Sequence, residues 1–81
     1  MIDHVTIRVP DLAQAQAFYG RGLELLGFCG LRTDFDDFSE WNDFSVAAAS
    51  ADRPPTRRLH IAFQAASPDQ VNAWWQATQP L

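Results

Sequence analysis

The sequence contains the same strand pattern twice, 56 residues apart. His4 begins a run of alternating residues over positions 4–9, and His60 begins a second run over positions 60–65. Alternation of apolar and other residues with a period of two is typical of β-strands. A chance match between two ordinary β-α units is the alternative explanation, but the paired histidines favour a duplicated unit. Two imidazoles brought together by such a duplication would form half of a metal site.

A helix signal follows each of the two strands. Each copy has an N-cap residue followed three positions later by glutamine, which is the spacing of a capping box: Asp11 and Gln14, then Ser67 and Gln70. The apolar periodicity predicts one helix over residues 12–26. A second helix is predicted to begin at Pro68, because proline is tolerated at the first helical position.

The remaining patterns predict further strands and a linker. Strands are expected over residues 28–33, 38–41 and 44–49, with 59–65 as a fifth. Residues 51–58, with two prolines at their centre, form the linker between a first βαβββ module, residues 1–50, and the start of a second, residues 59–81. The predicted fold class is α+β, with a mixed curved sheet and helices on its outer face. Doubling the 56-residue period gives about 112 residues, so we expect the chain to stop inside its second module.

Charge and composition exclude several classes of partner. The net charge is −4 and lysine is absent, so the chain lacks the clustered basic face that binds nucleic acid. The single cysteine allows no internal disulfide. No run approaches the roughly 18 apolar residues of a membrane helix, and we expect a cytoplasmic protein. Aromatic residues between 35 and 44 either line a ligand cavity or pack as core: Phe35, Phe38, Trp41 and Phe44.

The opening of the chain resembles the vicinal oxygen chelate superfamily, which includes glyoxalases, bleomycin-resistance proteins and extradiol dioxygenases. The resemblance is carried by residues 2–12, by Phe18-Tyr19 and by Leu26-Gly27-Phe28, while residues 59–63 resemble the first strand of a second module. Members of that superfamily pair two βαβββ modules into a cup. The resemblance implies a lyase, isomerase or dioxygenase reaction on a small oxygenated or drug-like molecule, and whether this chain is an enzyme stays open.

The resemblance also implies a ligand set. His4 and His60 fall on the two first-strand positions that bind a divalent metal in such proteins, and Fe, Zn, Ni or Mn would suit imidazole ligands. The carboxylate ligand of the superfamily comes from a last strand that this sequence lacks. Arg8 and Gln64 share the histidine-bearing faces, so we expect them to contact substrate, although a solvated position at the rim is the alternative for Arg8.

Two alternatives to the metal-dependent reading stay open. One is a metal-free module that sequesters a ligand, and the other is an inactive truncated product. A first strand without its own module would leave an unpaired edge, which favours pairing with another chain. We therefore expect a homodimer.

Overall fold

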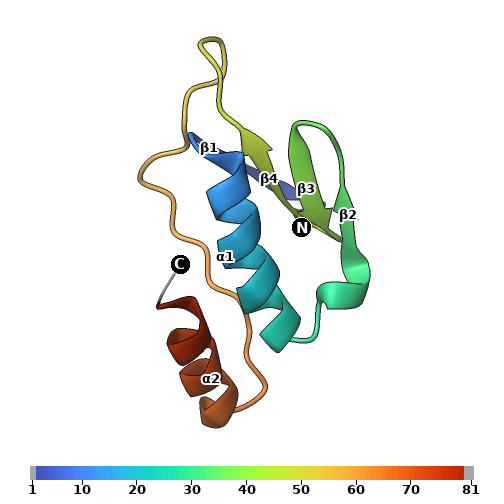
Figure 1. Cartoon of the computed structure of the whole chain (residues 1–81), viewed down its shortest axis with the longest axis vertical. Coiled ribbons are helices and arrows are strands. Elements are labelled where there is room, and N and C mark those ends of the chain that lie inside the picture. Colours follow the sequence, from blue (N-terminus) through green and yellow to red (C-terminus); the bar gives the residue numbers. More distant parts are fainter. Residues whose placement is uncertain (1, 80–81) are drawn as a thin grey trace.

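The computed structural model describes residues 2–79 as a four-stranded sheet with two α-helices (Figure 1). The elements follow in this order: β1 (Val5–Val9), α1 (Leu12–Leu25), a 3-10 helix η1 (Cys29–Leu31), β2 (Arg32–Asp34), β3 (Phe38–Trp41), β4 (Phe44–Ala48) and α2 (Pro68–Thr78). The predicted α+β class is confirmed. No helix among the described residues combines the length and the apolar character needed to span a bilayer.

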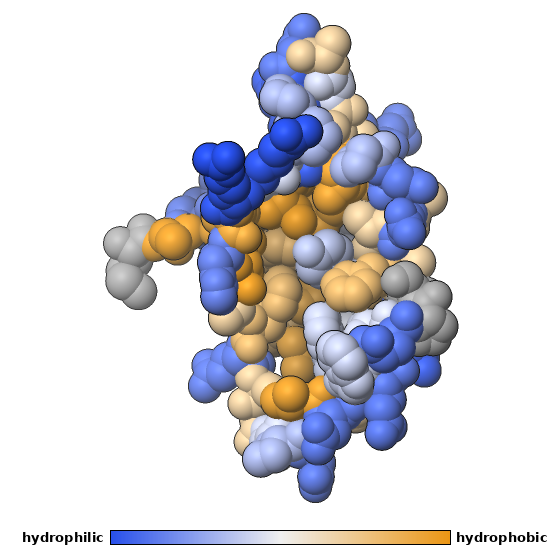
Figure 2. Space-filling view, turned by 90° about the vertical axis from the view of Figure 1, so that its left-hand side faces the viewer, coloured by the Kyte–Doolittle hydropathy of each residue, from blue (hydrophilic) through white to orange (hydrophobic). Residues whose placement is uncertain are grey.

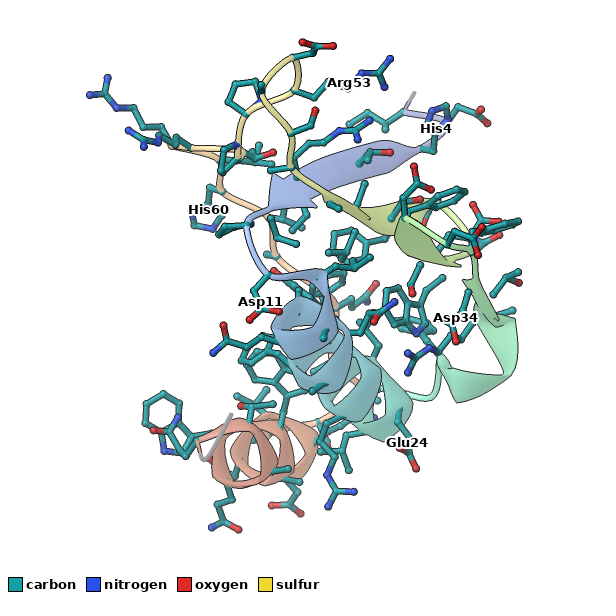
Figure 3. All side chains as sticks on the ribbon, turned by 45° about the horizontal axis from the view of Figure 1, so that its top comes forward. His4, Asp11, Glu24, Asp34, Arg53 and His60 are labelled. Atoms are coloured by element: carbon teal, nitrogen blue, oxygen red, sulfur yellow. The ribbon has the colours of Figure 1, made fainter. Side chains whose placement is uncertain are left out.

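The sheet has the strand order β1-β4-β3-β2 and two different faces. β1 pairs with β4 in parallel, and β3 pairs with β4 in antiparallel fashion. Because side chains alternate along a strand, Ile7 and Val46 face α1, whereas their neighbours Arg8 and Ala47 belong to the opposite face. In Figure 3 α1 lies between the sheet and α2, so both helices are on the same side of the sheet and α1 covers its face. We call the other one the open face.

Both helices begin at the predicted caps. The Asp11 carboxylate accepts a hydrogen bond from the Gln14 amide at 3.0 Å, and the Ser67 hydroxyl accepts one from the Gln70 amide at 3.2 Å. In the second helix the Gln70 side chain also reaches back, because its Oε1 accepts from the Ala66 amide at 2.6 Å. The capping chemistry read from the sequence therefore sets both helix starts.

The core lies between α1 and the centre of the sheet. Its buried apolar residues come from three strands and from α1: Ile7, Leu23, Trp41, Phe44 and Val46. α2 packs on α1 and not on the sheet. Trp74 meets Phe18 edge-on with ring centroids 5.4 Å apart, and the Gln70 side chain donates to the Leu25 carbonyl at 2.9 Å.

Two predicted strands begin later than expected. β1 starts at Val5 and not at His4, where the alternating run begins, because its partner β4 begins at Phe44, directly after a turn. The strand predicted from residue 28 is replaced at first by η1, in which the Leu31 amide bonds to the Phe28 carbonyl at 3.0 Å. The backbone of Phe28 is itself still bonded to the end of α1, so pairing in the sheet begins only at Arg32.

The fifth strand, predicted over residues 59–65, does not form. None of these residues makes a backbone–backbone hydrogen bond within the described part of the chain. The segment instead passes α1 as coil on its way to α2 (Figure 1). Phe63 packs into the core against Phe44 and Tyr19, with ring centroids 5.0 and 6.4 Å away. The alternating pattern therefore reflects the partial burial of Phe63 and Ala65 rather than pairing, because the described residues offer this segment no neighbouring strand.

Candidate functional site

His4 precedes β1 and is open to solvent. Its side chain is 69% exposed, and Nδ1 lies 3.3 Å from a carboxylate oxygen of Asp3. The next residue, Val5, donates its amide to the Asp43 carbonyl at 2.7 Å. His4 therefore sits at the end of the sheet where the turn between β3 and β4 also lies.

His60 lies elsewhere. It is exposed in the coil between the sheet and α2, and Figure 3 shows it well separated from His4. The described residues also contain no group of three or more histidine, cysteine, aspartate or glutamate side chains placed to hold a metal ion. The described part of one chain thus does not bring the two imidazoles together, and its residues do not form a set of ligands that fits a divalent metal. Their role as ligands stays a prediction that would require a second chain.

Arg8 lies on the open face of the sheet. Arg8 pairs with Ala47 of β4, and Ala47 pairs in turn with Phe38 of β3. The Arg8 guanidinium reaches across to the Ala48 carbonyl at 3.4 Å. Its backbone is held by Thr56, which receives the Arg8 amide on its hydroxyl at 2.8 Å and donates its own amide to the Arg8 carbonyl at 2.9 Å. Arg8 is therefore fixed, and it lines a cavity of about 260 Å³ together with Thr56 and Arg58.

Gln64 lies on the opposite side of the sheet, at a cavity of about 330 Å³. The cavity opens between the helix-covered face of the sheet, the end of α1 and residues 61–64. Its walls are mainly apolar: Val5, Leu23, Phe28, Trp41, Phe44 and Phe63. A volume of this size with apolar walls is within the range of small-molecule sites. Of the four residues proposed from the sequence, Gln64 is the one that lines it.

The polar part of the cavity rim comes from the turn between β3 and β4. Asn42 and Asp43 connect the paired residues Trp41 and Phe44, and both line the cavity. Asn42 has φ 56°, a left-handed conformation that asparagine tolerates better than most residues. The carbonyl of Asp43 accepts the bond from Val5 described above. The turn is thus held by the sheet, and it presents an amide and a carboxylate beside Gln64.

The cavity continues beneath the segment 59–65. Two neighbouring cavities of about 260 Å³ each share Ile61 and Phe63 with the first. Figure 2 shows apolar surface in a hollow between hydrophilic groups on this side of the molecule. Tyr19 lies in the same region, where burial raises the pKa of its phenol. The phenol therefore stays neutral at physiological pH.

The chemistry of this arrangement is recognition. Apolar walls can bury the body of a ligand, while the side-chain amides of Asn42 and Gln64 can donate hydrogen bonds to a ligand oxygen and the Asp43 carboxylate can accept one.

The four aromatic residues between positions 35 and 44, which were predicted either to line a cavity or to pack as core, fall into two pairs. Trp41 and Phe44 do both, whereas Phe35 and Phe38 stack on each other at 4.3 Å. Sequence reasoning missed Asn42 and Asp43 as site residues. The turn could be predicted, because Asn42 and Asp43 are turn-forming residues between two predicted strands. The sequence did not predict that residues 61–64 would lie close to this turn.

One comparison with known proteins gives a match. The sequence model of one protein family, the Glyoxalase/Bleomycin resistance protein/Dioxygenase superfamily, matches residues 1–79. A search of curated proteins gives no match. The family match covers nearly the whole chain and agrees with the observed β-α-β-β-β order. The chain therefore belongs to the Glyoxalase/Bleomycin resistance protein/Dioxygenase superfamily.

Proposed function

We propose that this protein binds a small, largely apolar molecule with one polar end in the cavity beside the β3–β4 turn. The observation that carries the proposal is the cavity itself. Its volume is about 330 Å³, its walls are mainly apolar, and its rim is polar. A ligand there would be buried against Trp41 and Phe44, and its polar end would meet Asn42 and Gln64. Ligand sites of this kind combine mostly apolar walls with few polar groups that fix orientation.

Calorimetric titration with 2-naphthylmethanol, a neutral aromatic alcohol, tests this proposal. We expect saturable binding to the full chain, and we expect Gln64→Ala to weaken it by about two- to tenfold, the value of one hydrogen bond. Gln76→Ala is the matched control, because Gln76 is an exposed glutamine of α2 outside the cavity. Absence of binding, or equal effects of the two substitutions, would refute the assignment of this site.

We further propose that the chain pairs with a second copy. The segment 59–65 and the outer edge of β1 leave backbone groups without partners in the described part of the chain, since Thr56 meets β1 only at Arg8. Leu59 and Ile61 in this region are 52% and 37% exposed. Unpaired backbone beside apolar side chains favours association with another strand. A two-fold symmetric dimer is the simplest such assembly.

Light scattering over a range of protein concentrations tests the dimer. We expect Leu59→Asp to raise the dissociation constant at least tenfold, because it places a charge beside the unpaired backbone. Ala51→Asp adds the same charge to the exposed loop before Thr56 and serves as control. A wild-type chain that is monomeric at all concentrations would refute the proposal.

The family resemblance implies a metal-dependent reaction. In this dimer such a reaction would require a metal site made of residues from both chains. His4 of one copy would have to meet His60 of the other, because a single copy separates them. Both imidazoles are exposed and therefore accessible to a second chain.

A further inference from the structure

The charge at the cavity rim has a single sign. Asp43 is the one acidic residue among the described residues that line this cavity, and no basic residue is among them. Lysine is absent from the sequence, and none of the six arginines or two histidines lines the cavity. In the described part of the chain, the Asp43 carboxylate takes part in neither a hydrogen bond nor an ion pair. Within this cavity a ligand thus meets a negative charge and no positive one, whereas Arg8 and Arg58 line the neighbouring cavity that shares Ile61 and Phe63 with it.

The position of this carboxylate is fixed by the fold. Asp43 follows the left-handed Asn42 in a two-residue turn, and the turn is closed by the pairing of Trp41 with Phe44. The bond from the Val5 amide to the Asp43 carbonyl at 2.7 Å ties the same residue to β1. The backbone that carries the carboxylate is therefore held by both neighbouring strands, which keeps the charge at the rim.

We propose that the cavity selects ligands that carry a protonated amine on an apolar body, and that Asp43 is the residue that selects them. This inference rests on the proposed function, because it names the ligand class of the same site. An ammonium group would pair with the Asp43 carboxylate while its apolar body fills the space against Trp41 and Phe44. A carboxylate ligand would instead place its charge against Asp43 and lose hydration without a cation in this cavity to replace it. The net charge of −4 acts in the same direction.

Three probes with the same naphthalene ring separate charge from apolar burial. They are 2-naphthylmethylammonium, 2-naphthylmethanol and 2-naphthoate, each titrated into the full chain by calorimetry at pH 7.5 and low ionic strength. We expect the ammonium to bind at least tenfold more tightly than the carboxylate, with the alcohol between them. The preference should shrink at high salt, because the rim is open to solvent and its charge is screened.

Asp43→Asn tests the residue itself. Asparagine keeps the size and polarity of the side chain but removes its charge, so we expect the ammonium to lose its advantage over the alcohol. Asp37→Asn is the matched control, because Asp37 is an exposed aspartate of the β2–β3 turn that does not line the cavity. The control should retain the wild-type preference.

The possible failures are distinguishable. If none of the three probes binds, the proposed function itself is wrong. If the alcohol binds but the carboxylate binds as tightly as the ammonium, the cavity stands and the inference about charge is overturned. An ammonium preference that survives Asp43→Asn also overturns the assignment to Asp43.

Discussion

The indole of Trp74 lies directly against Gly22 of α1. A Cβ atom built on Gly22 would come within 2.8 Å of Trp74 Cε2 and would overlap the indole Nε1. This contact explains why Trp74 Nε1 is buried without a hydrogen-bond partner in the described part of the chain. It also explains a glycine in the last turns of a continuous helix, where glycine costs about 1 kcal/mol relative to alanine. Gly22 allows α2 to approach α1.

Gly22→Ala should therefore destabilise the protein although it improves helix propensity. Overpacking costs typically about 1–3 kcal/mol, and the gain in propensity offsets about 1 kcal/mol of that. We expect a net loss of about 1 kcal/mol in the free energy of unfolding, measured by urea denaturation. Gly20→Ala is the control, because its Cβ would meet only the flexible end of Arg32. If the two substitutions have the same effect, the close packing of α1 and α2 is not as described.

Stability should also depend on pH through Asp34. The Ser39 hydroxyl donates to the Asp34 carboxylate at 2.6 Å and Arg32 donates at 2.9 Å, and these bonds lower the pKa of Asp34. A carboxyl with a lowered folded-state pKa contributes stability above its ordinary pKa of about 4, and that contribution is lost as the pH falls through the folded value.

The expected result is a smaller loss of stability on acidification in Asp34→Asn than in the wild type. Urea denaturation at pH 7 and at steps from pH 5 to pH 2.5 measures it. Asp36→Asn is the matched control, since Asp36 is exposed in the adjoining turn and has no side-chain hydrogen bond among the described residues. An acid dependence that is unchanged in Asp34→Asn would contradict this account.

Phe63 should be the residue that holds the segment 59–65 on the core. Its ring packs edge-on against Phe44 at 5.0 Å, and the segment has no backbone pairing among the described residues to replace that contact. We expect Phe63→Ala to cost about 1–3 kcal/mol, less than the loss at a fully buried phenylalanine. His60→Ala, at an exposed position of the same segment, should change stability by less than about 0.5 kcal/mol. Denaturation curves that coincide for the two variants would mean that the segment does not dock.

The local part of this structure could be predicted from the sequence and the long-range part could not. The caps at Asp11 and Ser67 act within three or four residues, so their sequence signature was sufficient. The strands β3 and β4 were also predictable, because a two-residue turn pairs them. Residues 59–65 carry an equally clear alternation, yet a strand exists only when a neighbour pairs with it. An alternating pattern therefore shows which side chains tend to be buried, but it does not show whether a second strand lies beside the segment to pair with it.

The candidate site shows the same limit. The duplicated pattern placed His4 and His60 at equivalent points, but equivalence in a repeat becomes proximity only if both copies form complete sheets. Here the second copy contributes coil and a helix, so the imidazoles separate. Gln64 lines a cavity and its contact with a substrate stays a prediction, while the turn that completes the cavity comes from 22 and 21 residues earlier, at Asn42 and Asp43. Only tertiary structure joins such distant segments.

Metal binding by the two histidines should therefore depend on a second chain. Neutral imidazole binds Zn²⁺ and Ni²⁺ well, and each exposed histidine can meet its counterpart only in a neighbouring copy. We expect Zn²⁺ to increase the dimer fraction of the wild type in light scattering. His4→Ala and His60→Ala should each abolish this effect of Zn²⁺.

A mixture of the two variants gives the sharper test. A heterodimer of the His4→Ala and His60→Ala chains keeps one complete pair of histidines, one from each chain, so Zn²⁺ should again promote association, with about half the number of sites. If the two histidines instead bound the metal within one chain, no chain in the mixture would carry both and the response would stay absent. A Zn²⁺ response restored by mixing would establish a shared site, whereas a wild-type monomer that binds Zn²⁺ through both histidines would show that a single chain can bring them together.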